Sequence, residues 1–471
     1  MLDVLKVLGG IKLDKTRESL QQNINKISTS FFIDPDYRTI AGQEIEHWNT
    51  SLLVISYALN ENALITGDPG FAKTTAAKVI SSVMSGYPFD LYEAAQIQGH
   101  PDQTFETMLA RLDFSKLHEE ERVIWLSSAY LPVRIIDELN RLPAGNQDEL
   151  LNCLETGRFN YLNSTFFTGV NPFFATANHP DNGTHDLIPA LKDRFAIQVE
   201  LGHLGASYRR DITDARDNIR SYLCNTDLTN DIIGVINNKK LSTQDKLAKI
   251  LELAEKFKSA EIYTTGDVMV FTSEMKTKFK QLITKIPLAT EANVLLECID
   301  SELNYSPTFG RKRSSDKVDT SNHAKNLASS KTENAFSNRG VDRLELYSQA
   351  VAYLSGCKQV KKEHINALAP HVIGHRIKFT ADFTAEHQDK IRPGFYGESL
   401  DMFLARQLVK EVEKNYAQVK DDLDLLKLRI DNKHASLELT LQQRIKDMLE
   451  NTHSTDHPLI RDYAHRIKRE K

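Results

Sequence analysis

One nine-residue stretch constrains the fold of this chain more than any other. An apolar run, Ala63 to Ile65, precedes it, and a helix-compatible run, Ala76 to Ile80, follows it. A glycine-containing loop between a strand and a helix is the context of a phosphate-binding loop, where backbone N–H groups face the phosphates. The stretch therefore predicts a nucleotide site made by Gly67, Asp68, Pro69, Gly70, Phe71, Ala72, Lys73, Thr74 and Thr75.

The side chains of this loop predict contacts with ATP and Mg²⁺. We expect Lys73 to reach the β- and γ-phosphates and the Thr74 hydroxyl to ligate Mg²⁺. The usual pattern, GxxxxGK[ST], has a second glycine where this chain has Ala72. A methyl group fits there if Ala72 keeps a negative φ, so we interpret the stretch as a variant loop. The alternative is a turn that happens to contain glycine, proline and lysine.

Bulk properties describe an ordinary soluble protein. The 471 residues favour two to four domains, and 41% apolar with 26% charged residues is typical of globular chains. The net charge of −5 weakly disfavours nucleic acid as the main partner. Four cysteines lie far apart without zinc-ligand spacing, which favours a reduced, cytoplasmic protein. No signal peptide and no apolar run near 18 residues is visible, so no membrane insertion is expected.

Short apolar segments alternate with helical ones after the loop. Three further strands are expected at Leu131–Ile136, Phe173–Ala177 and Phe195–Val199. Such alternation predicts an α/β fold with a parallel, doubly wound sheet, in which the active groups follow the carboxyl ends of the strands. Glu138 and Asn178 occupy such positions.

Five residues are candidates for the chemistry. Asp137 would hold Mg²⁺ through water, and Glu138 would orient and polarise the attacking water. Asn178 would hold that water or touch the γ-phosphate. Arg194 is a candidate arginine finger, with a surface salt bridge as the alternative. Arg339 is a candidate second nucleotide-contacting arginine.

Taken together, these motifs resemble those of the MoxR-type AAA+ ATPases. The similarity covers about residues 41–377 and leaves out the N-terminal segment and the C-terminal helices. It is carried by Gly67 to Thr74 with alanine before the lysine, Asp137-Glu138-Leu139-Asn140-Arg141 with Pro143 just after, Ala175 to Asn178, Asp193-Arg194-Phe195, Phe336 to Arg339, and the lid ending Ala367 to Ile377.

The resemblance implies an AAA+ P-loop NTPase core with an all-α lid, and hydrolysis of ATP to ADP and phosphate. It also implies a ring-forming, commonly hexameric, chaperone-like remodeller. Such proteins often work with a partner that carries a von Willebrand factor A domain, in metal-cofactor insertion or complex assembly. In related AAA+ proteins the arginine matched by Arg339 can act on a neighbour's nucleotide. The polar segment Glu93–Glu121 is expected to contact the substrate or partner, or else to be a plain surface loop.

Four parts are predicted along the chain: an N-terminal segment 1–40, a nucleotide-binding core 41–205, a helical lid 206–377 with a flexible insertion around 304–336, and a C-terminal helical extension 378–471. Helical spacing is expected to begin at Ala41 and to run to Leu59. A basic tail, Arg466 to Lys471, is expected to be a solvated end. The extension is expected to be coiled-coil-like, because apolar residues form a heptad-like stripe along a long helix. This stripe would either pack on its own domain or form an intermolecular coiled coil. Its residues are Val412, Tyr416, Val419, Leu423, Leu426, Ile430 and Leu437.

Two other functions compete with remodelling. A nucleic-acid-associated AAA+ motor shares the same core, but interleaved basic and aromatic residues are missing from the sequence near its insertions, so nucleic acid is an unlikely partner. A non-catalytic nucleotide switch is disfavoured because both Lys73 and Glu138 are present.

Overall fold

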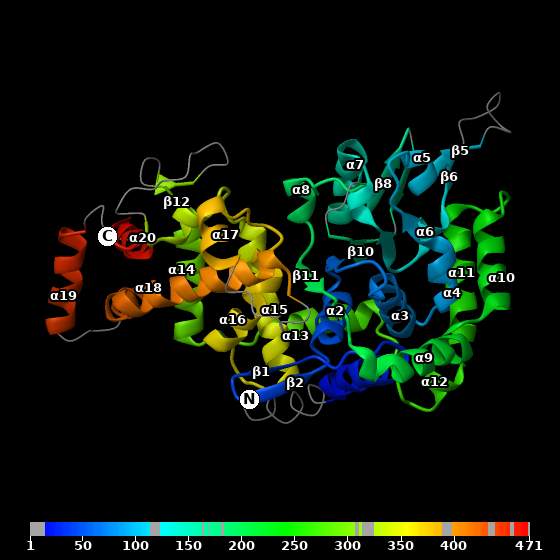
Figure 1. The fold of residues 1–471 in the computed structure, drawn as a ribbon, viewed down its shortest axis with the longest axis horizontal. Helices are drawn as coiled ribbons and strands as arrows, with labels where there is room; N and C mark the ends of the chain where they lie inside the picture. Colours follow the sequence, from blue (N-terminus) through cyan, green and yellow to red (C-terminus); the bar gives the residue numbers. More distant parts are fainter. Residues whose placement is uncertain are drawn as a thin grey trace. The chain divides into compact units, whose positions relative to one another are not determined.

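The computed structural model describes residues 15–113, 123–162, 164–167, 169–179, 183–306, 310–312, 325–388, 398–431, 439–452 and 456–469. These residues form two compact units (Figure 1). The first unit contains the described residues up to Lys285 together with Glu398, and the second contains the others from Ile286 onward. This division lies within the predicted lid, 206–377, and the four predicted domain bounds stay a prediction.

A five-stranded parallel sheet forms the centre of the first unit. Its strand order is β11–β3–β10–β7–β4. Helix α2 (Trp48–Leu59) packs on β11, and α3 (Lys73–Ser85) packs on β7 and β10. Strands β3 and β10 are nearly continuous apolar runs, as expected of parallel strands covered on both faces, whereas β4, β7 and β11 also contain polar residues. The sheet confirms the predicted α/β fold, and its strands are β3 (Ala63–Thr66), β4 (Ile97–Gln98), β7 (Arg134–Asp137), β10 (Phe173–Ala177) and β11 (Ile197–Glu200).

The register of β10 explains why the candidate residues meet. Phe174 pairs with Ala63 of β3, and Phe173 pairs with Arg134 of β7, both in parallel. The carboxyl ends of the three strands therefore lie at the same edge of the sheet. The phosphate loop, the acidic pair and Asn178 each begin at that edge.

The predicted helix from Ala41 to Leu59 begins later than expected. A hairpin of β1 (Tyr37–Ile40) and β2 (Gln43–Glu46) precedes α2, which starts at Trp48. Ala41 and Gly42 both have positive φ values, 53° and 82°, and they make the turn between the two strands. Ile45 is buried between two exposed glutamates, which is the alternation typical of a strand. Because Ile45 also fits the helical spacing, that alternation was overlooked in the sequence.

The segment between α3 and β7 contains short elements in place of one long loop. Helix α4 (Phe89–Ala95), β4 and α5 (Phe105–Met108) precede the hairpin of β5 (Ala110–Leu112) and β6 (Val123–Trp125). Residues 114–121 of the predicted partner-contacting segment lie outside the described residues. Gln98, within the same segment, ends β4 and is therefore part of the central sheet.

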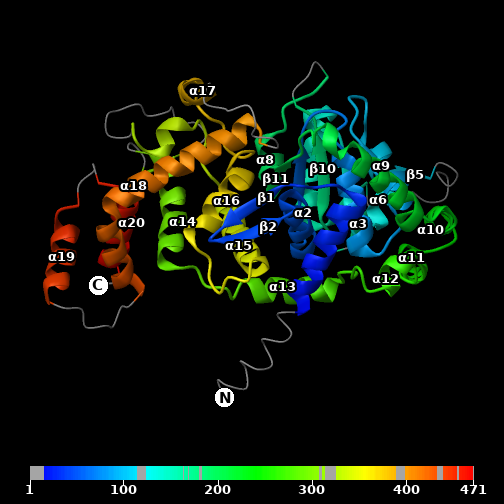
Figure 2. The same ribbon diagram turned by 60° about the horizontal axis from the view of Figure 1, so that its bottom comes forward.

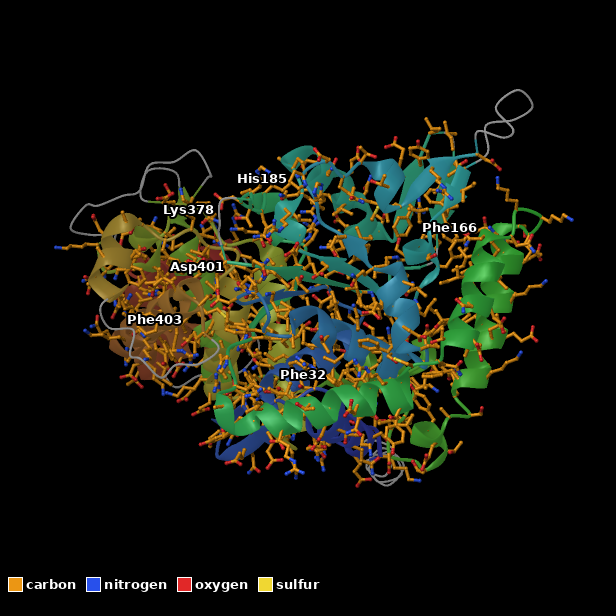
Figure 3. All side chains as sticks on the ribbon, turned by 45° about the vertical axis from the view of Figure 1, so that its right-hand side comes forward. Phe32, Phe166, His185, Lys378, Asp401 and Phe403 are labelled. Carbon is orange, nitrogen blue, oxygen red and sulfur yellow. The ribbon has the colours of Figure 1, made fainter. Side chains whose placement is uncertain are left out.

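A second hairpin, β8 (Arg158–Tyr161) with β9 (Ser164–Phe167), follows α7 (Ala144–Thr156). The ring of Phe166, labelled in Figure 3, lies 5.4 Å from that of Trp125 and 5.0 Å from that of Tyr130. Aromatic packing thus joins this hairpin to β6 and to α6 (Ser127–Tyr130). The short α8 (Pro189–Lys192) then leads to β11.

Helices fill the rest of the first unit, which confirms the helical pattern expected from Ser207. Three of them begin with side-chain N-caps: Asn225, Ser242 and Thr272 each accept a hydrogen bond from an amide of the first turn. The helices are α9 (Arg209–Asn218), the π-helix η5 (Ile219–Leu223), α10 (Thr226–Asn237), α11 (Thr243–Phe257), α12 (Glu261–Thr264) and α13 (Ser273–Ile283).

The described part of the second unit is almost entirely helical (Figure 2). Its longest helix, α18 (Leu400–Asp431), packs on α14, α16 and α20 and buries most of the predicted apolar stripe. The stripe therefore packs within its own unit; Leu437 lies outside the described residues. The other helices are α14 (Thr290–Leu303), α15 (Asn338–Leu354), α16 (Lys362–Ile373), α17 (Ala381–Gln388), α19 (Leu439–Glu450) and α20 (Pro458–Arg469).

Two segments of the second unit differ from simple expectation. In the predicted insertion, β12 (Tyr305–Ser306) pairs with β13 (Gly310–Arg311), and Lys312 Nζ donates to Ser329 O at 2.9 Å. These described parts are packed, whereas 307–309 and 313–324 lie outside the described residues. Residues 466–469 of the predicted basic tail form the end of α20, where Arg466, Lys468 and Arg469 are exposed as expected and Ile467 is buried. Apolar residues at helical spacing from Leu459 onward explain why the helix continues to its basic last turn.

Candidate nucleotide site

The phosphate loop has a strained backbone at Ala72. Its φ is +57°, in the left-handed region, so the expected negative φ is wrong. Gly67 and Gly70 also have positive φ values, and a Cβ built on Gly67 would lie 2.3 Å from Leu201 O. The turn into α3 thus needs the left-handed conformation that glycine adopts freely, and alanine adopts it here at a cost.

Lys73 lies folded over its own loop. Its Nζ donates to Gly67 O and Asp68 O, both at 2.8 Å, and the residue is 6% exposed. Burial lowers the pKa of this ammonium, while the nearby carboxylates of Asp137 and Glu200 act in the opposite direction. Phosphate oxygens are stronger acceptors than these two carbonyls, so the same ammonium is placed to bind them.

Two hydroxyl groups converge on Asp137. Thr74 Oγ1 donates to Asp137 Oδ1 at 2.5 Å, and Thr176 Oγ1 donates to the same oxygen at 2.7 Å. A hydroxyl and a carboxylate oxygen are hard donors that fit Mg²⁺, which keeps several water and phosphate ligands. No group of three or more His, Cys, Asp and Glu that could cage a metal exists in the described part of the chain. The residues thus fit a nucleotide-bound Mg²⁺ and not a metal held by protein alone.

Three side chains hold the carboxylate of Glu138. Asn178 Nδ2 donates to one oxygen at 3.0 Å, while Gln98 Nε2 at 3.3 Å and Arg141 Nε at 3.0 Å reach the other. The side chain is still 30% exposed. Its backbone is also left-handed, with φ 53°. A non-glycine residue in that region at a strand end is a mark of a functional position.

Asn178 is fixed by Asn140, a residue to which sequence analysis assigned no role. Asn140 Nδ2 donates to Asn178 O at 2.9 Å, and Asn178 N donates to Asn140 Oδ1 at 3.3 Å. Thr176 was missed as well: it accepts from Glu138 N at 2.9 Å while donating to Asp137. Both residues lie inside the motifs quoted above. That location was the only feature of the sequence that could have indicated their roles.

A cavity of about 550 Å³ contains these groups. One end is polar, with the phosphate loop, Asp137, Glu138 and Asn178; the other is largely apolar. The apolar end is lined by Phe31, Phe32, Ile33, Leu204, Ile212, Ala215 and Ile219. A cavity with an apolar end and a cation-bearing polar end suits a nucleoside triphosphate.

The apolar end comes from segments that sequence analysis left without a function. The sequence analysis assigns no role to residues 31–36, although the apolar run Phe31-Phe32-Ile33 before Asp34-Pro35 could have indicated a packed segment. Asp34 anchors this segment, because its Oδ2 accepts from Thr50 N at 2.7 Å at the start of α2. Arg216 of α9 also lines the cavity, and no ion pair joins it to another described residue.

The two predicted arginines lie outside the cavity lining. Arg194 Nη2 contacts Glu155 Oε2 at 3.0 Å, and its Nη1 donates to Ala190 O at 3.1 Å. That is the surface salt bridge given as the alternative, and it leaves the finger role a prediction. Arg339 belongs to the second unit, in the first turn of α15 after the N-cap Ser337. The structure brings together Lys73, Thr74, Asp137, Glu138 and Asn178.

A histidine borders the site beside Asn178. His179 Nε2 lies 2.8 Å from Glu200 Oε1, and this hydrogen bond raises the pKa of His179. Glu200 is buried at the end of β11, and His179 compensates its negative charge locally.

None of the helices in the described ranges is long and apolar enough to span a bilayer.

Comparisons with known proteins agree with this geometry. Residues 62–195 match the model of the AAA domain (dynein-related subfamily), and residues 326–393 match that of an AAA lid domain. The crystal structure of a putative ATPase from Cytophaga hutchinsonii ATCC 33406 is similar in fold, with 15% identity and a TM-score of 0.52. The match covers 87% of this chain and 98% of that one. No curated protein matches the chain.

Proposed function

We propose that this chain, an AAA+ ATPase by its domain and lid, is a ring-forming remodeller of MoxR type that acts on a partner protein or complex. One observation supports the catalytic part above all. Asn178 and Glu138 are hydrogen-bonded at 3.0 Å beside the phosphate loop, in the same cavity as Lys73. A base, its orienting amide and a phosphate-binding cation are the parts that hydrolysis of ATP requires.

In the proposed reaction each residue has one task. Lys73 binds the β- and γ-phosphates. Mg²⁺, held by the Thr74 hydroxyl and through water by Asp137, would neutralise charge on those phosphates. Glu138 orients and polarises the attacking water, and Asn178 keeps that carboxylate and the water in place. The apolar end of the cavity takes the base.

The proposed ring would supply an arginine finger from a neighbouring subunit, in addition to Arg216 of the cavity's own lining. The transition state carries extra negative charge on the γ-phosphate, and an arginine finger contributes on the order of 10³ in rate or more. Arg194 lies outside its own cavity lining, which supports a role at a neighbour's site. Arg339 is the second choice. A finger acting between subunits makes activity depend on oligomer formation.

Mixing two inactive variants tests this arrangement. Arg194→Ala keeps an intact phosphate loop, and Lys73→Ala keeps an intact arginine, so mixed rings contain some complete sites. We expect the mixture to regain ATPase activity that neither variant has alone. Arg210→Ala, an exposed arginine on α9, is the control and should behave like the parent. No recovery in mixed oligomers confirmed by light scattering would contradict the finger in trans.

The proposed partner belongs to the class suggested by the resemblance, a protein with a von Willebrand factor A domain, in metal-cofactor insertion or complex assembly. Glu138→Gln should hold ATP without turnover and should therefore keep a partner bound. We expect co-purification of a specific protein with this variant in ATP, and its loss with Lys73→Ala. Equal recovery with both variants would contradict ATP-driven remodelling.

A further inference from the structure

A second pocket, of about 430 Å³, lies within the second unit. It combines the region where α14 runs into the β12–β13 hairpin with the last helix of the chain, α20. The residues that carry the argument are Ser301, Tyr305, Arg311, Arg461, Asp462 and Lys468. Neither the AAA domain match nor the lid match covers α20.

The charges in this pocket are unbalanced. Asp462 is the only carboxylate among the described lining residues. Its Oδ2 accepts from Ser301 Oγ at 3.0 Å and lies 3.6 Å from Arg311 Nη2. That carboxylate is therefore already engaged, and it offsets Arg311.

Two cations of the pocket are left without a carboxylate. Arg461 Nη1 donates to the neutral Tyr305 hydroxyl at 3.1 Å, and its guanidinium lies 5.5 Å from the centre of that ring. Lys468 is exposed about two helical turns further along α20. Among the described residues, neither Arg461 nor Lys468 has an ion-pair partner.

Lysines elsewhere in the same unit show the contrast. Lys420 pairs with Glu291, Lys427 with Glu297 at 2.7 Å, and Lys362 with Glu413 at 3.4 Å. In these pairs a carboxylate offsets the cation, on a chain whose net charge is −5. A concave site that holds two uncompensated cations is consequently a local positive potential on an acidic protein, and it attracts anions.

We propose that this pocket binds an acidic peptide segment of a partner protein. Arg461 is held in place by Tyr305, and its planar fork matches a carboxylate in bidentate geometry. Lys468 adds a point charge for a second carboxylate. Nucleic acid is disfavoured because its binding requires a track of several phosphate contacts and free aromatic faces, whereas this pocket is confined and its one aromatic lining residue is occupied by Arg461. The site is independent of ATP hydrolysis.

Binding of a fluorescent glutamate-rich peptide of about ten residues to the full chain tests the proposal. The measurement uses anisotropy without nucleotide at about 50 mM salt, where surface electrostatics are strong. We expect saturable binding that weakens by about tenfold in Lys468→Glu and in Arg461→Gln. The matched control is Lys446→Glu, an exposed lysine of α19 outside the pocket lining, which should change the Kd by less than about twofold.

Several results would overturn the idea. These are no saturable binding, equal weakening by Lys446→Glu, equal affinity for a neutral serine-rich peptide of the same length, and displacement of the peptide by duplex DNA or inorganic phosphate at comparable concentrations. Unfolding temperature and ATPase rate report whether each variant is folded. If Arg461→Gln is unstable, the exposed Lys468→Glu carries the test alone, and unchanged binding by it rejects the pocket.

Discussion

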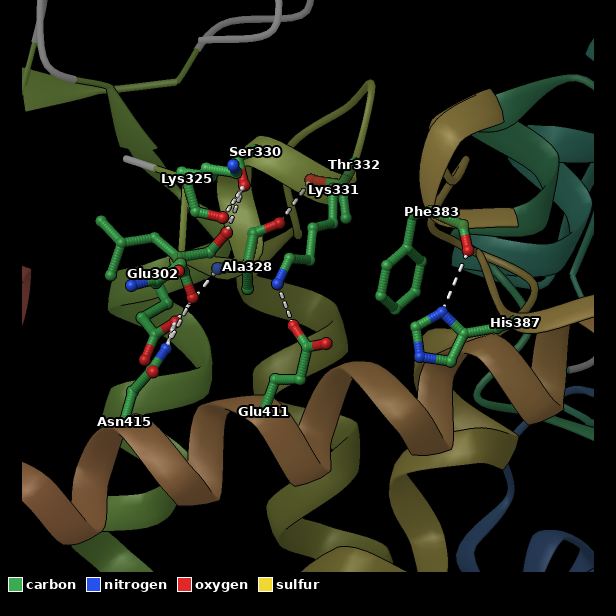
Figure 4. A network of polar contacts seen from close by, with 12 residues as sticks. Glu302, Lys325, Ala328, Ser330, Lys331, Thr332, Phe383, His387, Glu411 and Asn415 are labelled. Carbon is green, nitrogen blue, oxygen red and sulfur yellow. Dashed lines mark hydrogen bonds and ion pairs between the residues drawn. The ribbon is translucent and has the colours of Figure 1, made fainter. Parts of the chain in front are cut away.

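Glu138 in the first unit and Glu302 in the second are both carboxylates held by three polar groups. Glu138 accepts hydrogen bonds from Asn178 and Gln98, forms an ion pair with Arg141, and stays 30% exposed at a cavity. Glu302 has no exposed surface. Its donors are Ala328 N, Asn415 Nδ2 and His457 Nε2, all at 3.0 Å, and the first two are drawn in Figure 4.

The difference between the two lies in what surrounds the donors. Those of Glu302 come from three separate segments, the 3-10 helix η6 (Ala328–Lys331), α18 and the residue before α20, and the carboxylate has no exposed surface. They join the C-terminal helices to α14. Those of Glu138 leave one side of the carboxylate open to the cavity, where a water can replace a donor. The same residue type serves structure in one place and, in the proposed function, chemistry in the other.

The largest effect is expected from Glu138→Gln. The amide keeps the shape but cannot act as a base, so kcat should fall by about 10² to 10⁴ while the Kd for ATP changes little. Steady-state ATPase assays and equilibrium binding of a fluorescent ATP analogue measure the two quantities. Glu93→Gln, an exposed residue of α4 paired with Lys78, is the control. Parent-like turnover in Glu138→Gln would remove this residue from the chemistry.

Glu302→Gln should act on stability alone. One amide oxygen cannot accept what the carboxylate accepts, and the new N–H₂ group would face another donor, so unfolding should become easier by about 3 kcal/mol. Urea denaturation of the second unit measures this loss. Glu411→Gln, which removes a partly exposed ion pair between Glu411 of α18 and Lys331, should cost about 0.5 kcal/mol. A loss of kcat with unchanged stability in Glu302→Gln would break the comparison.

Sequence patterns predicted which residues meet at the carboxyl edge of the sheet. Strands β3, β7 and β10 are apolar runs with polar residues directly after them, and parallel pairing puts those residues together by geometry alone. Local pattern was sufficient because Lys73, Asp137, Glu138 and Asn178 each stand at a strand end or loop.

The remainder depends on contacts between residues far apart in the chain. The donors of Glu302 are 26, 113 and 155 positions away from it along the chain, so no local sequence pattern can predict them. The apolar end of the nucleotide cavity likewise joins residues 31–36 to α9. The β1–β2 hairpin was missed because Ile45 fits both a helical spacing and a strand alternation.

A buried cation extends the comparison to positive charges. Lys276 of α13 lies under Tyr57, with Nζ 3.6 Å from the ring centre, and burial lowers its pKa to about 7. The unfolded chain then binds more protons than the folded one between pH 7 and 10.5, so stability rises with pH in that window and the cost is complete below it. The gain from pH 7 to pH 9 should be on the order of 2 kcal/mol.

Lys276→Met should flatten that pH dependence and stabilise the protein at pH 7, since the ring contact offsets only part of the desolvation cost. Denaturant titrations at pH 7, 8 and 9 give the slopes. Lys278→Met, an exposed neighbour on the same helix, should leave the slope unchanged. Identical slopes in the parent and in Lys276→Met would mean that this lysine stays charged in the folded state.

The smallest expected effect concerns backbone strain, which also differs between the two units. All non-glycine residues with positive φ in the described ranges belong to the first unit: Ala41, His47, Asn60, Ala72, Glu138 and Leu162. Two of these positions, Ala72 and Glu138, are in the nucleotide cavity, where the loop and the proposed water-orienting carboxylate have a conformation that side chains disfavour. Strain is retained where the geometry serves a ligand.

Ala72→Gly should therefore stabilise the first unit by about 1 kcal/mol, because glycine adopts φ +57° without the clash of a Cβ. The side chain is exposed, so its removal leaves no cavity. Ala77→Gly, in the regular part of α3, is the matched control and should destabilise by a similar amount, since glycine weakens helix interiors. Opposite signs for the two substitutions in thermal unfolding would locate the strain in the loop, and destabilisation by both would show that the left-handed turn at Ala72 costs nothing.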